Sequence, residues 1–338
     1  MNVIEPTTHD GKMRTKLLTI VFVLALIVPS LLKAQTQEDV IKSFNKAFAL
    51  AQAEKHLEAF NGFEATIAMA EKVGADVADI KTKAETQLAP LMFKHAGSLY
   101  KLKKVSEALE SFAKAKDVAT KYNDNSIAQK SDGVMMKVYN NLGTNEFKRA
   151  NYDEALVNYE KALAINGNYD AAIFNLAEAL NKQNKRDESI AMLEEARKVG
   201  GRINSPSIIR KAERKAAEYL IYWGSTAIEQ QKYSAANEYL TKAIIYDVES
   251  SDAYYRLAEL ANKQGQYAEA VDFAEQALDF EKGPKSERAK IYFELGLAEQ
   301  SIGNNDKACE AFKSASFGRF KAAAQHKIEF ELKCDEAK

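Results

Sequence analysis

The sequence predicts an all-α solenoid of stacked antiparallel helix pairs. Two observations lead to this fold class: a helical pattern recurs at a spacing of 34 residues, and no stretch of the chain shows the alternation of a β-strand. A fixed period of this length indicates repeats that stack on one another, because one helix pair cannot bury its own apolar face.

Five copies of the pattern carry this prediction, and they begin at Met136, Asp170, Ala217, Ser251 and Ala289. Positions 4, 7, 8 and 11 of each copy share one face of a first helix, and positions 20, 24 and 27 share one face of a second. We expect the small residues at 8, 20 and 27 to let the helix backbones approach, and the larger ones at 4, 7 and 24 to fill the space between helices. In the first copy these positions hold Tyr139, Leu142, Gly143, Glu146, Ala155, Tyr159 and Ala162.

This pattern resembles the tetratricopeptide repeat (TPR). The resemblance rests on the runs Tyr139–Gly143 and Tyr152–Ala155, with Tyr159 and Ala162 beyond them, and it extends over residues 136–322. The frequent proline near position 32 of that family is absent from every copy. The resemblance implies a right-handed superhelical solenoid whose first helices line a concave, protein-binding groove.

The resemblance is weaker towards the N-terminus. Phe93, Ala96, Gly97, Tyr100, Ala108, Phe112 and Ala115 make one further copy, and residues 38–73 hold a degenerate one. We therefore expect a leader at 1–34, degenerate helical repeats at 35–133, a solenoid of five repeats at 134–322, and the end of a C-terminal capping helix with a tail at 323–338.

The spacing between copies predicts where the helices are interrupted. Pro90, Pro206 and Pro284 fall between the proposed repeats, as expected for a residue that breaks helices. We also expect residues 121–133 to be irregular rather than helical. The starts at 170 and 217 are 47 residues apart instead of 34, so we expect an insertion around 200–216.

The N-terminus has the features of a secretory signal peptide. Lys12, Arg14 and Lys16 precede the apolar run Leu17–Leu32, and Ala34 follows as a small residue at the exit. This run has 16 residues, fewer than the ~20 that span a bilayer as a helix. We expect export to a bacterial periplasm or cell envelope. An uncleaved run would instead anchor the protein in the membrane, and Met13 is an alternative start residue.

Two cysteines, Cys309 and Cys334, lie 25 residues apart near the C-terminus. In an oxidising compartment they can pair. The amphipathic segment 320–332 is predicted to form a helix that covers the last apolar face of the solenoid. A disulfide would then fix this helix to the last repeat. Two separate thiols are the alternative.

Signals for catalysis, metal and nucleic acid are weak. The formal net charge is −1, which gives no global basic surface for nucleic acid. The histidines are scattered, and neither a glycine-rich phosphate loop nor a catalytic motif is present. We therefore expect no enzyme activity, no cofactor and no metal site.

The expected binding site is the inner face of the first helices, which the resemblance places at positions 2, 5, 9 and 12. Position 5 of the five copies holds Asn140, Phe174, Ile221, Tyr255 and Phe293, and position 12 contributes Phe147, Asn181 and Asn262. Aromatic rings with interleaved amides suit a bound peptide, because rings supply contact area and amides hydrogen-bond a backbone. The alternative is that the rings pack between neighbouring first helices.

Together these features predict an exported scaffold that binds a protein or peptide partner, in envelope assembly or a periplasmic complex. Two other functions remain open. One is a solute- or glycan-binding protein that uses the same groove, which a pocket closed by the insertion at 200–216 would favour. The other is a membrane-anchored structural spacer, which retention of Leu17–Leu32 would favour.

The first prediction concerns the leader. The mature chain is expected to begin near Gln35, because the apolar run is short and has a basic start and a small exit residue. Intact mass of the natively exported protein checks this. A mass that still includes Leu17–Leu32, recovered in a membrane fraction, would place the protein in the anchored class.

Overall fold

The computed structural model describes residues 36–334, which form helices and turns with no β-strand among them. This confirms the predicted all-α fold. The predicted leader at 1–34, residue 35 and the last four residues lie outside this range. The chain divides into two compact units, Met1–Met135 and Met136–Lys338, with the boundary inside α6 (Asn125–Lys148). Each unit is described separately.

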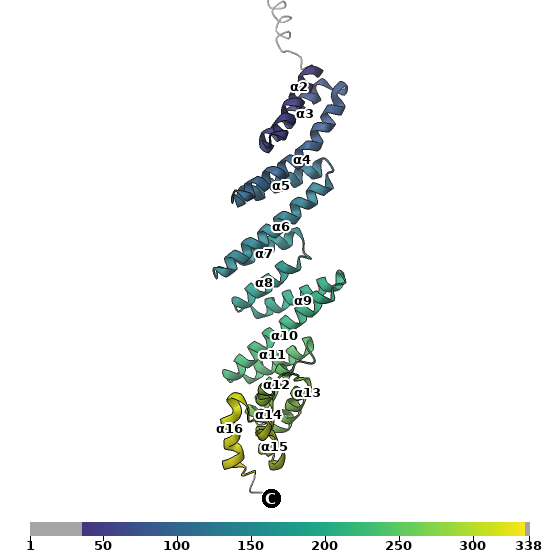
Figure 1. The fold of residues 1–338 in the computed structure, drawn as a ribbon. Coiled ribbons are helices and arrows are strands. Elements are labelled where there is room, and N and C mark those ends of the chain that lie inside the picture. Colours follow the sequence, from purple (N-terminus) through teal and green to yellow (C-terminus); the bar gives the residue numbers. More distant parts are fainter. Residues whose placement is uncertain (1–35, 335–338) are drawn as a thin grey trace, which may run out of the picture. The chain divides into compact units, whose positions relative to one another are not determined.

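The first unit consists of helix pairs that bury one continuous set of aromatic and aliphatic side chains. Phe60, Phe63, Leu88 and Met92 form the centre of this core. Thr36 opens the first helix with a capping box, in which its hydroxyl accepts from the Asp39 backbone N–H. The helices are α2 (Gln37–Gln52), α3 (His56–Val73), α4 (Ala78–Lys101) and α5 (Val105–Lys121), with a short 3-10 turn, η2 (Ala75–Val77), before α4 (Figure 1).

Pro90 departs from the expectation that proline separates repeats. It lies inside α4, which continues for 24 residues. Proline cannot donate to the carbonyl one turn earlier, which costs about 3 kcal/mol in a helix interior. Leu88 and Ala89 before it, and Leu91 and Met92 after it, are all buried. Packing on both sides of the proline therefore keeps the helix continuous.

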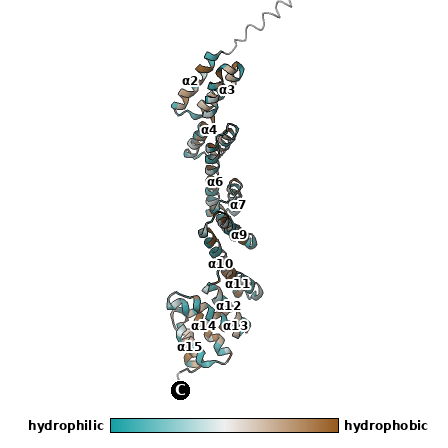
Figure 2. Cartoon of the chain, turned by 90° about the vertical axis from the view of Figure 1, so that its right-hand side faces the viewer, coloured by the Kyte–Doolittle hydropathy of each residue, from teal (hydrophilic) through white to brown (hydrophobic). Residues whose placement is uncertain are grey.

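The second unit repeats the helix pair along the rest of the chain (Figure 1). The second half of α6 is its initial first helix, and the remaining first helices are α8 (Asp170–Lys182), α10 (Pro206–Glu229), α12 (Ser251–Gln264) and α14 (Lys285–Ser301). The second helices are α7 (Tyr152–Ile165), α9 (Arg186–Arg202), α11 (Tyr233–Tyr246), α13 (Tyr267–Phe280) and α15 (Asn305–Ala315). Figure 2 shows apolar and polar residues on the same helices, as amphipathic packing requires.

Position 8 of the repeat is where the two helices of a pair approach most closely. A Cβ built on Gly143 would lie 2.6 Å from the Tyr159 ring. The equivalent Cβ atoms on Gly224 and Gly296 would lie 2.7 Å from Leu240 and 2.8 Å from Phe312. Each neighbour occupies position 24. The prediction that a small residue at position 8 lies at a close approach of the two helices is therefore confirmed in three repeats, and the structure shows that its neighbour is position 24.

The turns between paired helices share one backbone geometry. Each has one residue with positive φ, such as Ala150 at 63° or Gly265 at 75°. The next N–H then reaches back to the carbonyl of position 11; Asn151 N–H donates to Glu146 O at 3.0 Å, and Gln266 N–H to Ala261 O at 2.9 Å. This bond satisfies a carbonyl that the helix end would otherwise leave unpaired.

Two stretches expected to be irregular are mainly helical. Of the stretch 121–133, residues from Asn125 onward belong to α6. The extra residues between the starts at 170 and 217 lengthen α9 to Arg202 and begin α10 at Pro206, so only residues 203–205 connect the helices. Pro206 and Pro284 do lie at helix starts, where a missing N–H costs nothing.

The last repeat is covered by a short capping segment. It consists of a 3-10 turn (Gly318–Phe320), α16 (Lys321–His326) and a π-helical turn (Lys327–Glu331). Ala324, Ile328 and Leu332 pack against Phe312 of α15. A disulfide joins Cys309 on α15 to Cys334 just beyond this segment, with Cα atoms 5.7 Å apart.

The second prediction compares two glycines of the same repeat position. Gly143→Ala is expected to lower the melting temperature, because the new Cβ would overlap the buried Tyr159 ring and overpacking costs about 1–3 kcal/mol. Gly97→Ala, at the same position of an N-terminal copy, has no atom within 4 Å of its Cβ and is expected to stabilise by up to about 1 kcal/mol. Thermal unfolding followed by circular dichroism measures both. Equal shifts of the two variants would contradict the assigned register.

Candidate functional site

The structure places the predicted position-5 residues between helices. Phe174, Tyr255 and Asn140 are 4%, 5% and 8% exposed, and Ile221 and Phe293 are half-buried. The ammonium of Lys211 lies 3.9 Å from the Phe174 ring centre, and Phe293 packs on Phe320 of the capping segment at 5.3 Å. These rings therefore have little area left for a ligand, and their environment fits the packing role that the sequence left open.

The direction of side chains around a helix explains this burial. Each residue turns about 100°, so position 5 points about 100° away from the packing stripe of positions 4, 7, 8 and 11. A side chain in that direction meets the next first helix. Positions 2, 6, 9 and 13 point about 150–170° away from the packing positions 4, 7, 8 and 11, towards solvent.

The predicted amides bond to neighbouring first helices. Asn175 Nδ2 of α8 donates to Asn140 Oδ1 of α6 at 2.9 Å. Asn262 Nδ2 of α12 donates to the backbone oxygen and to Oε2 of Glu294 on α14, both at 2.9 Å. Side-chain hydrogen bonding also links Asn181 to Tyr219. These bonds satisfy the amide nitrogens of Asn175 and Asn262, whereas the buried Oδ1 of Asn262 has no hydrogen-bond partner among the described residues.

Burial changes the acidity of groups beside these contacts. It raises the pKa of Tyr255 to about 12 and that of Tyr219 to about 12, so both phenols stay neutral at ordinary pH. Burial also raises the pKa of Glu294, while the hydrogen bond from Asn262 acts in the opposite direction. Phe147, the remaining predicted residue, is half-buried with its ring 5.4 Å from that of Tyr152.

The exposed surface of the first helices is the stripe at positions 2, 6, 9 and 13, named here the first-helix stripe. None of its residues is buried, whereas none of the residues at positions 5 and 12 is exposed. Tyr222 of α10, 67% exposed, is its largest apolar side chain in contact with solvent. The stripe consists of Lys137, Asn141, Thr144, Lys148, Ala171, Asn175, Glu178, Lys182, Glu218, Tyr222, Ser225, Glu229, Asp252, Arg256, Glu259, Lys263, Lys290, Glu294, Leu297 and Ser301.

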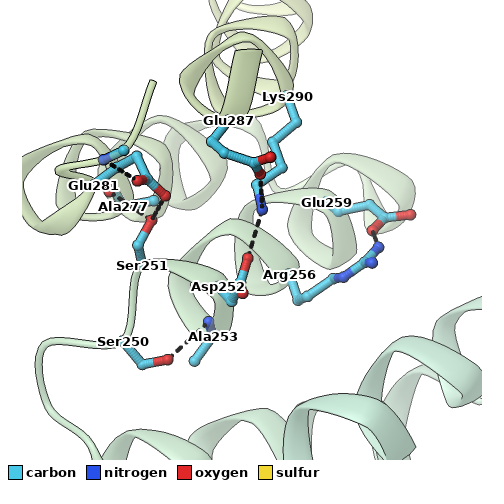
Figure 3. Close-up of polar contacts among 11 residues, drawn as sticks. Ser250, Ser251, Asp252, Ala253, Arg256, Glu259, Ala277, Glu281, Glu287 and Lys290 are labelled. Atoms are coloured by element: carbon cyan, nitrogen blue, oxygen red, sulfur yellow. Dashed lines mark hydrogen bonds and ion pairs between the residues drawn. The ribbon is translucent and has the colours of Figure 1, made fainter. Parts of the chain in front are cut away.

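Ion pairs hold the part of the stripe on α12 and α14 (Figure 3). Lys290 Nζ of α14 lies 2.6 Å from Asp252 of α12 and 3.5 Å from Glu287, and Arg256 lies 2.7 Å from Glu259. Both signs of charge alternate along this surface. Such a pattern suits a polar partner with complementary charges better than a uniformly charged one.

A cavity that sequence reasoning missed lies between α9, α10 and α11. Its volume is about 620 Å³, and Arg186 is one of its lining residues. The guanidinium lies 5.4 Å from the ring centres of both Trp223 and Tyr239, and its Nη1 donates to Tyr239 Oη at 3.1 Å. Arg186 occupies position 17 of its copy, where three other copies have tyrosine. This exchange is the feature of the sequence that could have pointed to the cavity.

A second cavity, of about 520 Å³, lies beside the extended N-terminal half of α10. Its lining includes Arg210, Lys211 and Arg214, together with Glu213 and Asp247. Residues of the 200–216 stretch therefore do border a cavity, but one lined mainly by charged groups and open on the outside of α10. This chemistry differs from the aromatic sugar-stacking surface of the glycan hypothesis.

Two features are absent from residues 36–334. No helix in that range is long and apolar enough to cross a membrane. Within the same range, no group of three or more His, Cys, Asp or Glu side chains is arranged to hold a metal ion.

Three segments of the second unit match models of the tetratricopeptide repeat, at residues 146–201, 223–287 and 289–316. This chain is a TPR protein. The matched segments lie within the repeats derived from the sequence spacing. The comparison with curated proteins gave no match.

Several solved structures resemble this TPR protein. MamA protein is 21% identical over 59% of this chain and 97% of its own, with a TM-score of 0.37. YrrB, described as a TPR protein with an unusual peptide-binding site, is 16% identical over 61% of this chain and 97% of its own, with a TM-score of 0.37. A tetratricopeptide repeat protein from Parabacteroides merdae is 14% identical over 86% of this chain and 97% of its own, with a TM-score of 0.29.

The third prediction separates packing residues from surface residues. Phe174→Ala is expected to lower the free energy of unfolding by about 3–5 kcal/mol, because the ring is buried and its loss leaves a cavity. Tyr222→Ala, which removes an exposed ring of similar size, is expected to change it by less than about 0.5 kcal/mol. Urea unfolding of both variants tests this. Comparable losses would mean that Tyr222 belongs to the core.

Proposed function

We propose that this TPR protein is an exported scaffold that binds a protein partner through the first-helix stripe of its second unit, within a periplasmic or cell-envelope complex. Tandem repeats of this family present surfaces to other proteins, and the fold of this chain is of that kind. Export is inferred from the leader at 1–34.

The exposure of Tyr222 is the observation that carries the choice of surface. Tyrosine is enriched among residues that dominate binding energy, because it combines apolar area with a polar end and has few rotatable bonds. Here its ring is 67% exposed, and the residues around it on the stripe are polar or charged. A large exposed ring within a polar surface is the expected composition of a contact centre with a polar rim.

Contacts within the first-helix stripe, and between it and the residues beside it, favour a preformed surface. Asn140 to Asn175 and Asn262 to Glu294 connect successive first helices, and Lys290 to Asp252 adds an ion pair between α12 and α14. A surface that is already ordered loses less conformational entropy when it binds. We therefore expect association without large rearrangement of these helices.

The solute-binding alternative has one supporting observation, the cavity of about 520 Å³ beside α10. Its three cations and two acids would select a small charged solute rather than a neutral sugar. The spacer alternative depends on retention of Leu17–Leu32 and is decided by the mass measurement above.

The fourth prediction tests the surface by site-specific photo-crosslinking. A benzoylphenylalanine at position 222 is expected to yield one discrete crosslinked partner from the envelope fraction. The same group at Val157, which is 48% exposed on the second helix α7, is the matched control and is expected to yield none. Once the partner is known, Tyr222→Ala should weaken binding about 30-fold, equivalent to about 2 kcal/mol.

Two results would contradict this proposal. Crosslinking from position 157 but not from position 222 would move the interface to the second helices. Unchanged partner affinity in Tyr222→Ala, with unchanged stability, would remove Tyr222 as the contact centre.

A further inference from the structure

The first turn of α14 carries two cations that have no acidic partner among the described residues. Lys285 is the first residue of the helix and Arg288 follows three positions later, so both side chains share one face. Their interactions are with aromatic rings and a hydroxyl. Lys290, on the same helix, instead pairs with Asp252 and Glu287.

These two cations border a cavity of about 200 Å³ together with Tyr292, Ser314 and Phe317. No acid belongs to this lining. The larger cavities described above each include acids, Asp187 and Glu188 in one and Glu213 and Asp247 in the other. The cavity at α14 therefore has a single sign of charge.

Hydrogen-bond donors outnumber acceptors around this cavity. Arg288 Nη2 donates to Tyr292 Oη at 3.2 Å, which leaves the phenol proton free to donate. Arg288 Nε is buried and has no acceptor. The ammonium of Lys285 lies 5.5 Å from the Phe317 ring centre, and the Ser314 hydroxyl completes the set from α15.

The two cations beside this cavity repel each other. They lie one turn apart, at the end of the helix where the backbone dipole is already positive, and the acid of the same turn, Glu287, pairs with Lys290. The N-cap residue, Pro284, provides no side-chain hydrogen bond to this end. A bound anion would offset both the repulsion between the two cations and their repulsion from the helix end, because it attracts the cations and the helix end alike.

We propose that this pocket binds a small dianionic oxyanion of the phosphate class. Two positive charges match a dianion, and a tetrahedral group can accept from donors that converge from Lys285, Arg288, Tyr292 and Ser314. The same chemistry is offered by a free phosphate and by the phosphomonoester headgroup of a lipid. The residues of this site are not part of the first-helix stripe. The phosphate site and the proposed function are therefore tested independently of each other.

Thermal unfolding of the mature chain in inorganic phosphate tests the site, with sodium chloride holding ionic strength constant. Phosphate is expected to raise the melting temperature saturably at millimolar concentration. Lys285→Gln/Arg288→Gln should raise the half-saturating concentration at least tenfold. Arg210→Gln/Arg214→Gln, which makes the same charge change beside a cavity with acids, is the matched control and should respond like the unsubstituted chain.

The melting temperature without phosphate distinguishes binding from simple destabilisation. In chloride alone, Lys285→Gln/Arg288→Gln is expected to melt close to the temperature of the unsubstituted chain, because the relief of repulsion at the helix end offsets the lost contacts with Phe317 and Tyr292. Lys285→Arg keeps the charge and should retain phosphate binding within a few-fold.

Vesicles distinguish the two sources of phosphate. Co-sedimentation is measured with phosphatidic acid in neutral lipid and with neutral lipid alone. A phosphate-induced shift without vesicle binding indicates a free solute, and vesicle binding that Lys285→Gln/Arg288→Gln abolishes indicates a headgroup. The site is overturned if neither probe binds, or if the double variant responds to both probes like the unsubstituted chain.

Discussion

The close contact between positions 8 and 24 is the constraint on which the rest of the second unit depends. Gly143, Gly224 and Gly296 leave room for a ring or a leucine that would otherwise be less than 3 Å from a Cβ atom. Because the contact fixes the rotation of the first helix about its axis, it also fixes where every other residue of that helix points. Positions 5 and 12 then face the next first helix, and positions 2, 6, 9 and 13 face solvent.

Once these directions are set, the chemistry of each position follows from burial. A buried amide needs a partner, and Asn140 and Asn262 find theirs on the adjacent first helix. An aromatic ring at position 5 is more stable packed against neighbouring helices than exposed to water, and Phe174 and Tyr255 are both buried. The remaining positions 2, 6, 9 and 13 are mostly polar and vary between copies, and Tyr222 is the most exposed aromatic ring among them.

Irregularities in the repeat produce the cavities. The extension of α10 forms one wall of the charged cavity at Arg210, and arginine in place of tyrosine at position 17 lines another. The copies that start at 251 and 289 are 38 residues apart instead of 34, and after these extra residues α14 begins with Lys285 and Arg288 beside Phe317. A regular solenoid buries its helix faces uniformly, so sites for small ligands are expected where the regular pattern is broken.

The sequence by itself determined the helix pairs, their register from 136 onward, the glycine contact and the covering of the last repeat, because spacing of three and four residues reports directly on which side chains share a helix face. Tertiary structure decided the rest. Pro90 stays within α4 because buried residues on both sides outweigh the lost hydrogen bond, and residues from Asn125 join α6 without an apolar pattern of their own. Exposure at positions 5 and 6 depends on the neighbouring repeat. Whether a cation has an acidic partner, as Lys290 has in Asp252, or only aromatic and polar neighbours, as Lys285 has, depends on helices distant in sequence.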